Sequence, residues 1–509
     1  MDLLSDTLRQ VFNNPQLPAV WHSLYAILLS SSRDQALQPL IDWRAPDPDA
    51  EFLRLTFLWS ITGDKAFGIQ AARLLLNNPK LAVDRIADFN AFAWGSVITQ
   101  GASSDEFADL LRQLSLPYLV QRLSNHAQTL VSTPSQWRST QQPQRVALVT
   151  TQLCNGQHTP SALVAAQTRL LVEQGMTVEI FSAQELTIAT PLVFFGSTLE
   201  VKLPPFDTEY WQSVLPKGVQ LTASDSRFSM LSRWQLMMTA INAFSPDVII
   251  LCGLYSPLVG ALYRHYPVLG LNVHALPLLQ PVDVWLSADP QPAIEPEMFW
   301  GLSFGTTQTH YYPYRINRTP APTQLQRSDF GIADDAVIWI SVGARLNQEI
   351  TASWASEISN LLDHCGKVHW LLVGIDSLPA ELNGVSSERI HVLGYRTDVV
   401  ALLDIADIYL NPPRIGGGFS VAEAMGQGLP VVSFANSDGG HKVGAQAVAT
   451  QQQYIHLLSE LTAHKAERQA FGEVLRERFN RDLDLAQAGD SLKAALETTC
   501  KVAAKRLQK

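Results

Sequence analysis

The chain has 509 residues, which is enough for about three domains of ordinary size. Its hydrophobic content of 46% and its charged content of 17% are typical of globular proteins and exclude extended disorder. The formal net charge of -10 and the lack of any basic run argue against a nucleic-acid-binding protein.

Neither the N-terminal sequence nor the cysteine pattern is typical of a secreted protein. The acidic start of the chain is not that of a signal peptide, and no apolar run reaches the ~18 residues of a membrane span. The four cysteines are widely scattered, with no spacing typical of a disulfide framework or a metal site. We therefore expect a soluble cytoplasmic protein without a transmembrane segment or a bound metal ion.

Residues 1–140 show helical patterns and few strand signals. Apolar residues recur at three- and four-residue spacing, as in Leu24, Ile27 and Leu28. Breaks that contain proline separate such segments, and no convincing repeat period is present. We expect an all-α N-terminal domain, a helical bundle or helix-hairpin array, that serves for packing or partner contact.

Residues 145–315 are predicted to form a first Rossmann-like domain. A linker at 132–144, rich in Ser, Thr, Gln and Pro, precedes it. An apolar strand at 145–151, a helix at 161–175 and a strand at 177–181 alternate as in a βαβ unit. Further strands are predicted at 192–195, 248–252, 268–273 and 282–286, and a further helix at 229–244.

Residues 325–490 are predicted to form a second Rossmann-like domain, and residues 491–509 a C-terminal helix. Its strands are predicted at 337–342, 368–374, 390–395, 408–410 and 431–434, and its first long helix at 351–365. Ligands of open α/β sheets bind outside the carboxyl ends of the strands. We therefore expect the two sheets to face one site.

A glycine-rich turn, Gly416 to Gly418, follows the predicted strand at 408–410. The glycines free the backbone for a close approach to a ligand. Ser420 and Glu423 have the spacing of a capping box, which predicts a helix that begins there. A helix N-terminus offers unpaired N–H groups to an anion, so this turn is a candidate phosphate site. The alternative is a strand-to-helix turn that binds nothing.

The stretch from Gly417 to Val432 resembles the GT-B-fold glycosyltransferases that use nucleotide sugars. Their C-terminal domain carries a glycine-rich turn, a helix with an acidic residue, and then Ala-(Met/Leu)-x-x-Gly-x-Pro-Val-Val, which is matched here from Ala424 onward. The resemblance covers roughly residues 145–490. It implies an α/β fold with two tandem Rossmann-like domains, here behind an all-α domain. It also implies transfer of a sugar from a UDP- or GDP-linked donor without a metal ion or other cofactor.

The resemblance also implies a set of donor-binding residues. By this resemblance, Arg345 lies in the loop that meets the donor diphosphate, Glu423 corresponds to the acidic residue that bonds the ribose, and residues 393–396 border the base. The full implied set is Arg345, Tyr395, Arg396, Gly417, Gly418, Phe419, Ser420 and Glu423. An ordinary ion pair is the alternative for Arg345, and a helix cap for Glu423.

One departure from the family pattern concerns the stereochemical outcome. Many retaining members have a glutamate eight positions before the second one, and Ile415 stands there in this chain. The pattern without it is closer to the O-GlcNAc transferase group and its bacterial N-glycosyltransferase relatives, which invert. The loop from Asn155 to Ser161 is loosely similar to their Gly-x-His-Pro-Thr-Ser segment. Retention and inversion both stay open.

Two histidines are candidates for the catalytic base or for orienting the acceptor. His158 and His274 each follow a predicted strand of the first sheet, and imidazole accepts protons near neutral pH. A loop histidine bonded to backbone is the alternative. We also interpret Asp438 to Lys442 as a solvated loop, with phosphate binding by Lys442 as the second interpretation.

The acceptor is not identified by these patterns. A protein, a glycan or a lipid-linked sugar would each serve. Two other functions stay open: a non-catalytic scaffold that binds a partner through its helical domain, and a nucleotide-sugar epimerase.

Overall fold

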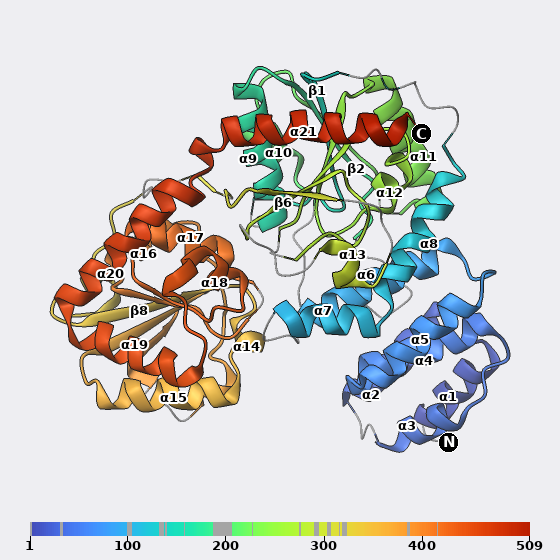
Figure 1. Ribbon diagram of the computed structural model, residues 1–509. Helices are drawn as coiled ribbons and strands as arrows, with labels where there is room; N and C mark the ends of the chain where they lie inside the picture. Colours follow the sequence, from blue (N-terminus) through green and yellow to red (C-terminus); the bar gives the residue numbers. More distant parts are fainter. Residues whose placement is uncertain are drawn as a thin grey trace.

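A computed structural model shows a helical region followed by two parallel sheets, each covered by helices (Figure 1). This arrangement confirms the predicted fold class. The structure describes residues 3–30, 34–98, 104–131, 137, 140–156, 158–186, 206–225, 227–273, 276–289, 295–302, 307–314, 316–317, 323–383, 387–414 and 416–508.

The N-terminal region is helical throughout its described part. Its helices are α1 (Leu3–Asn13), α2 (Pro18–Ser30), α3 (Asp34–Asp42), α4 (Pro48–Thr62), α5 (Lys65–Asn77), α6 (Val83–Ile98), α7 (Ser104–Gln113) and α8 (Leu116–Gln128). Helix α4 shows why the breaks fall where they do: the Asp47 side chain caps its first turn, and Gly63 ends it in the left-handed conformation.

This helical region shares its hydrophobic core with the first sheet domain. One continuous set of buried side chains runs from Trp21 in α2 through Leu119 in α8 to Leu258 in α12 (Pro257–Leu262). Figure 1 shows α6 and α8 against the sheet domain, with α1 to α5 farther out. The contact between α8 and α12 is close because a glycine, Gly260, faces Ser124. The helical region is therefore packed onto the sheet domain.

The first sheet has seven parallel strands in the order β3-β2-β1-β4-β5-β6-β7. These are β1 (Arg145–Thr150), β2 (Thr177–Ser182), β3 (Gln220–Ala223), β4 (Val248–Cys252), β5 (Val268–Leu271), β6 (Val284–Ser287) and β7 (Gln308–Tyr311). Its helices are α9 (Thr159–Glu173), α10 (Thr208–Val214), α11 (Met230–Phe244), α12 and α13 (Pro296–Trp300).

The two edge strands, β3 and β7, are not among the predicted strands. Both are four residues long, and all of their side chains are exposed or half-buried. They therefore lack the apolar run that marks a buried parallel strand. The strand predicted at 192–195 lies outside the described residues.

The second sheet has five parallel strands in the order β10-β9-β8-β11-β12. They are β8 (Val337–Val342), β9 (Val368–Val373), β10 (Ile390–Val392), β11 (Ile408–Leu410) and β12 (Val431–Val432). Its helices are α14 (Leu346–Glu349), α15 (Ala352–His364), α16 (Val399–Ile405), α17 (Gly418–Gln427), α18 (Asp438–Val443), α19 (Gln451–Ala463) and α20 (Lys465–Arg478).

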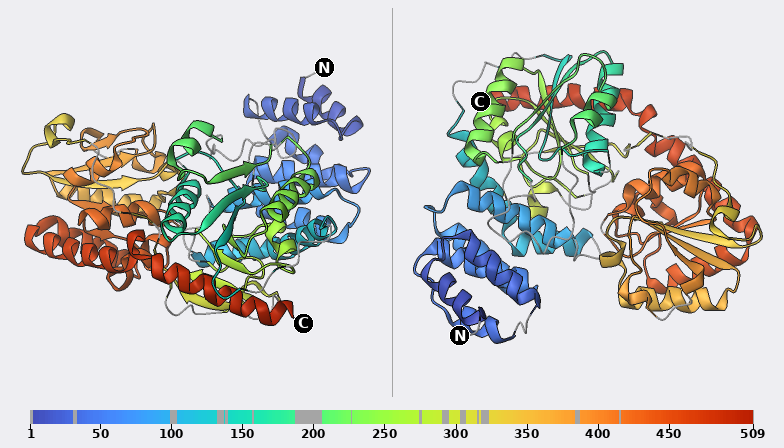
Figure 2. Two further views of the ribbon diagram at one scale, coloured as in Figure 1. Left: turned by 90° about the horizontal axis from the view of Figure 1, so that it is seen from above. Right: turned by 180° about the vertical axis from the view of Figure 1, so that it is seen from behind.

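The last helix, α21 (Gly489–Leu507), returns to the first sheet domain and packs along β4, β5 and β6. It crosses that domain in Figure 1 and in the right view of Figure 2. Arg506 near its end donates to both carboxylate oxygens of the buried Asp283, at 2.9 and 2.8 Å. The C-terminal helix, which follows the second sheet domain in the sequence, is therefore part of the first sheet domain. Among the described residues, no helix has the length and apolar character needed to cross a membrane.

Candidate functional site

The site in the second sheet lies where the strand order reverses. From β8 the chain proceeds to β9 and β10 on one side, and later to β11 and β12 on the other. The loops after β8 and β11 therefore leave neighbouring strands in opposite directions, which opens a crevice at their carboxyl ends. Residues 343–345 follow β8, and residues 411–417 follow β11.

Arg345 reaches from the first loop to the glycine turn of the second. A side chain added at Gly416 would place its Cβ 3.0 Å from Nη2 of Arg345. Arg345 is about a quarter exposed, so its guanidinium is accessible at this edge. The structure thus brings Arg345 together with the turn that the sequence singles out.

Helix α17 begins earlier than predicted, and the expected capping box is wrong. Gly417, with a φ of 85°, is the N-cap, and no side chain caps the helix. The Ser420 hydroxyl donates to the Gly417 carbonyl at 3.1 Å and accepts from the Tyr409 hydroxyl at 2.7 Å. The N–H groups of Gly418, Phe419 and Ser420 are the first three of the helix and have no acceptor within it. They are directed toward the crevice end of the helix, where an anion is favoured.

A buried network behind the turn was not identified from the sequence. Arg414 is 3% exposed and donates to Oε2 of Glu349 at 3.0 Å, to Oδ1 of Asn411 at 2.8 Å and to the Val342 carbonyl at 2.9 Å. The other oxygen of Glu349 accepts from Nε of Arg345 at 3.0 Å. One carboxylate therefore positions both arginines. The four-residue spacing of Arg345 and Glu349 is a sequence signal for half of this network.

Charge balance keeps Glu349 ionised. Burial alone would raise the pKa of its carboxyl, but the guanidinium groups of Arg345 and Arg414 outweigh it and lower the pKa. Two positive charges share this one negative charge, so the network carries a net positive charge next to the helix terminus. Such a charge suits a phosphate ligand.

Glu423 lies one turn into α17 and behaves differently from Glu349. Its side chain is half-buried, and within the described part of the chain it has no hydrogen-bond or ion-pair partner. Burial raises the pKa of its carboxyl to about 7. A carboxyl in this state is able to bond a hydroxyl group of a ligand, which is the role that the family resemblance implies.

The interpretation of Asp438 to Lys442 as a solvated loop is wrong. These residues form α18, in which the Asp438 and Lys442 side chains are only 6% and 2% exposed, with Nζ and Oδ1 separated by 3.7 Å. Oδ2 of Asp438 lies beside Gly418, where an added Cβ would come within 2.3 Å of it. The Ser437 hydroxyl caps this helix, and the sequence offers no apolar periodicity that would have indicated burial.

Tyr395 and Arg396 follow β10, two strands away from β8. Tyr395 is 55% exposed. Arg396 pairs with Asp398 through two bonds of 2.8 and 2.6 Å. Neither residue is in a hydrogen bond or ion pair with the Arg345 network in the described part of the structure. Their assignment to the base site stays a prediction.

In the first sheet domain the strand order reverses between β1 and β4. The loop after β1 leaves the sheet at this point. Phe419, in the first turn of α17, packs against the hydrophobic core of this domain. His158 follows β1 and is the N-cap of α9, 8% exposed. Its Nδ1 lies 2.9 Å from the Ser161 hydroxyl oxygen, which also accepts from the Cys154 N–H. Among the residues that the structure describes, the histidine ring is therefore held by a side chain and not by backbone.

Burial lowers the pKa of His158 to about 4. The imidazole is consequently neutral at physiological pH.

His274 and Ile415 lie outside the described residues. The aromatic residues at 310–314 belong to β7 and the segment after it, where His310 bonds Ser491 of α21 at 3.0 Å and Tyr312 bonds Gln167 at 2.9 Å. In the described part of the chain, no three His, Cys, Asp or Glu side chains are grouped as metal ligands would be.

The arrangement in the second sheet can be compared with known proteins. Residues 338–460 match the family described as glycosyl transferases group 1. The second sheet is a group 1 glycosyltransferase domain. The match spans the Arg345 network, the glycine turn of the group 1 domain and Glu423. No curated protein matches the chain in sequence.

Solved structures show the fold of the whole chain. A mutant O-GlcNAc transferase of Thermobaculum terrenum superposes with a TM-score of 0.59 and 15% identity, covering 98% of this chain and 94% of that one. This similarity confirms the GT-B fold, helical region included. A glycosyltransferase from Rickettsia africae has a TM-score of 0.48 and 13% identity, covering 72% of this chain and 99% of its own. A glycotransferase of kitacinnamycin has a TM-score of 0.45 and 14% identity, covering 70% of this chain and 99% of its own.

Proposed function

We propose that the protein transfers a sugar from a nucleotide-sugar donor to an acceptor hydroxyl or amide, with the donor held by the group 1 domain. The observation that carries this proposal is the meeting of Arg345 with the glycine turn. Its guanidinium lies beside Gly416, and α17 begins two residues later without a side-chain cap, so its first N–H groups have no acceptor within the helix. A diphosphate there would be bonded by a permanent cation and by backbone donors at once.

The same groups would stabilise the leaving nucleotide. As the glycosidic bond breaks, negative charge develops on the diphosphate, and donors already in place lower the barrier. In this proposal Arg345 and the α17 terminus balance that charge, so a metal ion is not required for transfer. Glu423 would bond the ribose of the same nucleotide.

His158 is the proposed base on the acceptor side. For Nε2 to accept the acceptor proton, Nδ1 has to carry the ring hydrogen and donate it to the Ser161 oxygen. The 2.9 Å separation permits that bond. With a pKa of about 4 the imidazole is neutral but only weakly basic, so it would act by orienting the acceptor and taking its proton late, as bond formation acidifies the nucleophile.

The acceptor class is proposed to be a protein, with a glycan or a lipid-linked sugar as the other classes. The helical region, packed on the acceptor-side sheet, provides a large surface for a protein chain. Because one structural relative that covers 98% of this chain is an O-GlcNAc transferase, N-acetylglucosamine is the first sugar to test.

The test is a thermal-shift screen of UDP- and GDP-sugars against the wild type and Arg345→Ala. We expect one nucleotide sugar to raise the melting temperature, and Arg345→Ala to weaken its binding by about 10- to 100-fold through loss of charge-assisted hydrogen bonds. Arg389→Ala is the matched control, since Arg389 is a paired arginine of the same domain that contacts Asp363 and the end of α15. Mass spectrometry of a lysate incubated with the donor then identifies the acceptor.

Three outcomes would contradict the proposal. If no nucleotide stabilises the wild type, the donor site is wrongly assigned. If the donor sugar is isomerised without an acceptor, the protein is an epimerase. If nucleotide binds but donor is neither hydrolysed nor transferred to any acceptor, the protein is a scaffold.

A further inference from the structure

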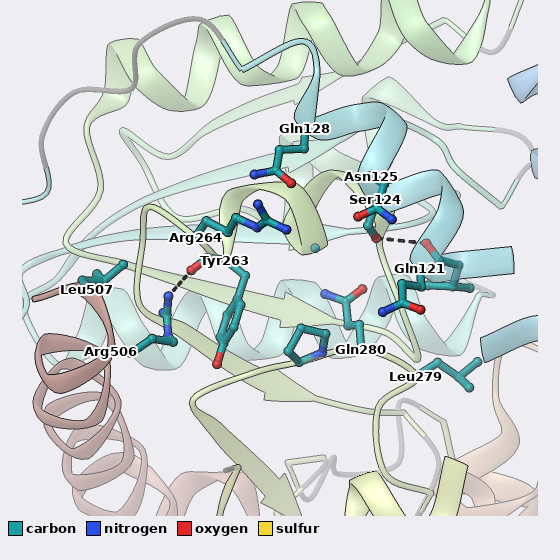
Figure 3. A pocket seen from close by; sticks show the side chains of 13 residues that line it. Gln121, Ser124, Asn125, Gln128, Tyr263, Arg264, Leu279, Gln280, Arg506 and Leu507 are labelled. Atoms are coloured by element: carbon teal, nitrogen blue, oxygen red, sulfur yellow. Dashed lines mark hydrogen bonds between the residues drawn. The ribbon is translucent and has the colours of Figure 1, made fainter. Parts of the chain in front are cut away.

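A second cavity lies outside the donor and acceptor loops, at the junction of α8, α12 and the end of α21 (Figure 3). Its volume is about 430 Å³, which is within the range of small-molecule sites. None of its lining residues belongs to the Arg345 network, the glycine turn or the His158 loop. Three segments far apart in the sequence build it, and Gly260 permits their close approach.

The walls of this cavity are rich in primary amides. Gln121, Asn125 and Gln128 recur at three- and four-residue spacing on one face of α8. Figure 3 shows them across the cavity from Gln280 and Arg264. Among the described residues, the three α8 amides have no side-chain hydrogen-bond partner. Each amide both donates and accepts, which matches the hydrogen-bonding character of a hydroxyl group.

Gln280 is the strongest sign that this cavity binds something. The residue is 2% exposed, and its Oε1 accepts from the Ser256 N–H at 2.6 Å. Its Nε2 has no hydrogen-bond partner among the described residues. Leaving a buried N–H₂ group unbonded is costly, so a turn of this side chain toward the cavity would let the amide bond an acceptor atom of a ligand.

The charge of the cavity is positive and comes from one residue. Arg506 also lines the wall, but Asp283 neutralises it, and its guanidinium lies over the Tyr263 ring at 3.7 Å. Arg264 is exposed and has no ion-pair or hydrogen-bond partner in the described part of the chain. Of the described residues that line the cavity, none is acidic. An anionic group is therefore favoured next to Arg264.

We propose that this cavity is a second, non-catalytic site for a polyhydroxylated ligand that carries one anionic group, such as a sugar phosphate or a uronic acid. The amides bond its hydroxyl groups and Arg264 its anionic group. Because α8 belongs to the helical region and α21 to the end of the chain, the ligand joins the helical region, the first sheet and the C-terminal helix. Binding there stabilises this three-way junction without occupying the donor site.

Isothermal titration with glucose 6-phosphate, glucuronate, glucose and inorganic phosphate tests the proposal. The wild type is expected to bind one or both of the anionic sugars with one-to-one stoichiometry, and glucose and phosphate at least about tenfold more weakly. The stronger of the two anionic sugars identifies the anionic group. Arg264→Gln is expected to lower that affinity about tenfold or more, and Asn125→Leu severalfold. Both positions are exposed, so these variants are expected to retain the wild-type melting temperature.

Two control variants separate this site from others. Arg73→Gln changes an exposed arginine on α5 that does not line the cavity, and Arg345→Ala changes the donor site; neither is expected to alter binding. The proposal is overturned if neither anionic sugar binds, if phosphate or glucose alone binds equally well, or if Arg345→Ala abolishes binding while Arg264→Gln does not. Loss of nucleotide binding in Arg345→Ala, by contrast, bears only on the donor site.

Discussion

Glu349 and Arg414 form an ion pair, 3.0 Å between Oε2 and Nη1, whose two side chains are 5% and 3% exposed. The pair joins the segment after β8 to the segment after β11, and the second oxygen of Glu349 holds Arg345. A structural pair that is deeply buried thus positions a residue that is accessible at the crevice.

Glu349→Gln is expected to destabilise the protein strongly. The substitution leaves Arg414 buried without a counter-charge, which costs about 3 to 5 kcal/mol in other proteins. Chemical denaturation measures this loss. In the double variant Glu349→Leu/Arg414→Met much of the stability should return, because neither charge is then buried alone. A double variant less stable than Glu349→Gln would contradict this explanation, because the unpaired charge of Arg414 would then not be the main cause of the lost stability.

Gly416→Ala is expected to weaken nucleotide binding with little loss of stability. The added Cβ would lie 3.0 Å from Nη2 of Arg345, which is the movable end of a side chain, so the guanidinium is displaced. We expect a loss of about tenfold in affinity, equal to about one lost hydrogen bond. Gly366→Ala is the matched control, since no atom lies within 4 Å of its added Cβ. An unchanged affinity in Gly416→Ala would place the diphosphate elsewhere.

Glu423 is expected to make stability fall as pH rises. Its folded-state pKa of about 7 is above the ordinary value of 4.5, so the folded protein binds more protons than the unfolded chain between these values. The free energy of unfolding therefore decreases from about pH 4.5 to about pH 7. Glu423→Gln removes this decrease and should be more stable than the wild type above pH 7, on the order of 1 to 3 kcal/mol, with little difference near pH 4. Urea denaturation across this range measures the effect, and an unchanged pH profile in the variant would contradict it.

His158→Ala is expected to lower kcat by about 100- to 10,000-fold while donor affinity is unchanged. With its pKa at about 4, His158 does not titrate near neutral pH. In a plot of the wild-type kcat against pH, protonation of this residue should therefore cause no decrease in kcat above about pH 5. Ser161→Ala, which removes the partner of Nδ1, should have a smaller effect on kcat. Pre-steady-state turnover with a saturating donor measures both. A variant that loses donor affinity instead would assign His158 to the donor side.

The sequence by itself determined the order and type of the main elements. Buried parallel strands such as β1 and β8 are continuous apolar runs, and such runs are visible without any partner strand. The glycine turn was also visible, because it follows a strand end, whereas the donor-binding roles of Arg345 and Glu423 came only from the resemblance to the glycosyltransferase family. The short edge strands β3 and β7 were not visible, since half-buried strands of four residues lack that run.

Only the tertiary structure decided which side chains share the site. Arg414 is a polar residue without a local pattern, and it is buried because Glu349, distant in the sequence, supplies its counter-charge. Asp438 has its counter-charge four residues away in Lys442, but the segment around Gly418, distant in the sequence, packs against it. Ser420 likewise lies inside α17 and does not cap it, since Gly417 is the N-cap and the Ser420 hydroxyl bonds the Tyr409 hydroxyl of the neighbouring strand. Local spacing fixes elements because helices and strands are periodic, whereas charge pairing and burial depend on contacts that the folded chain alone brings together.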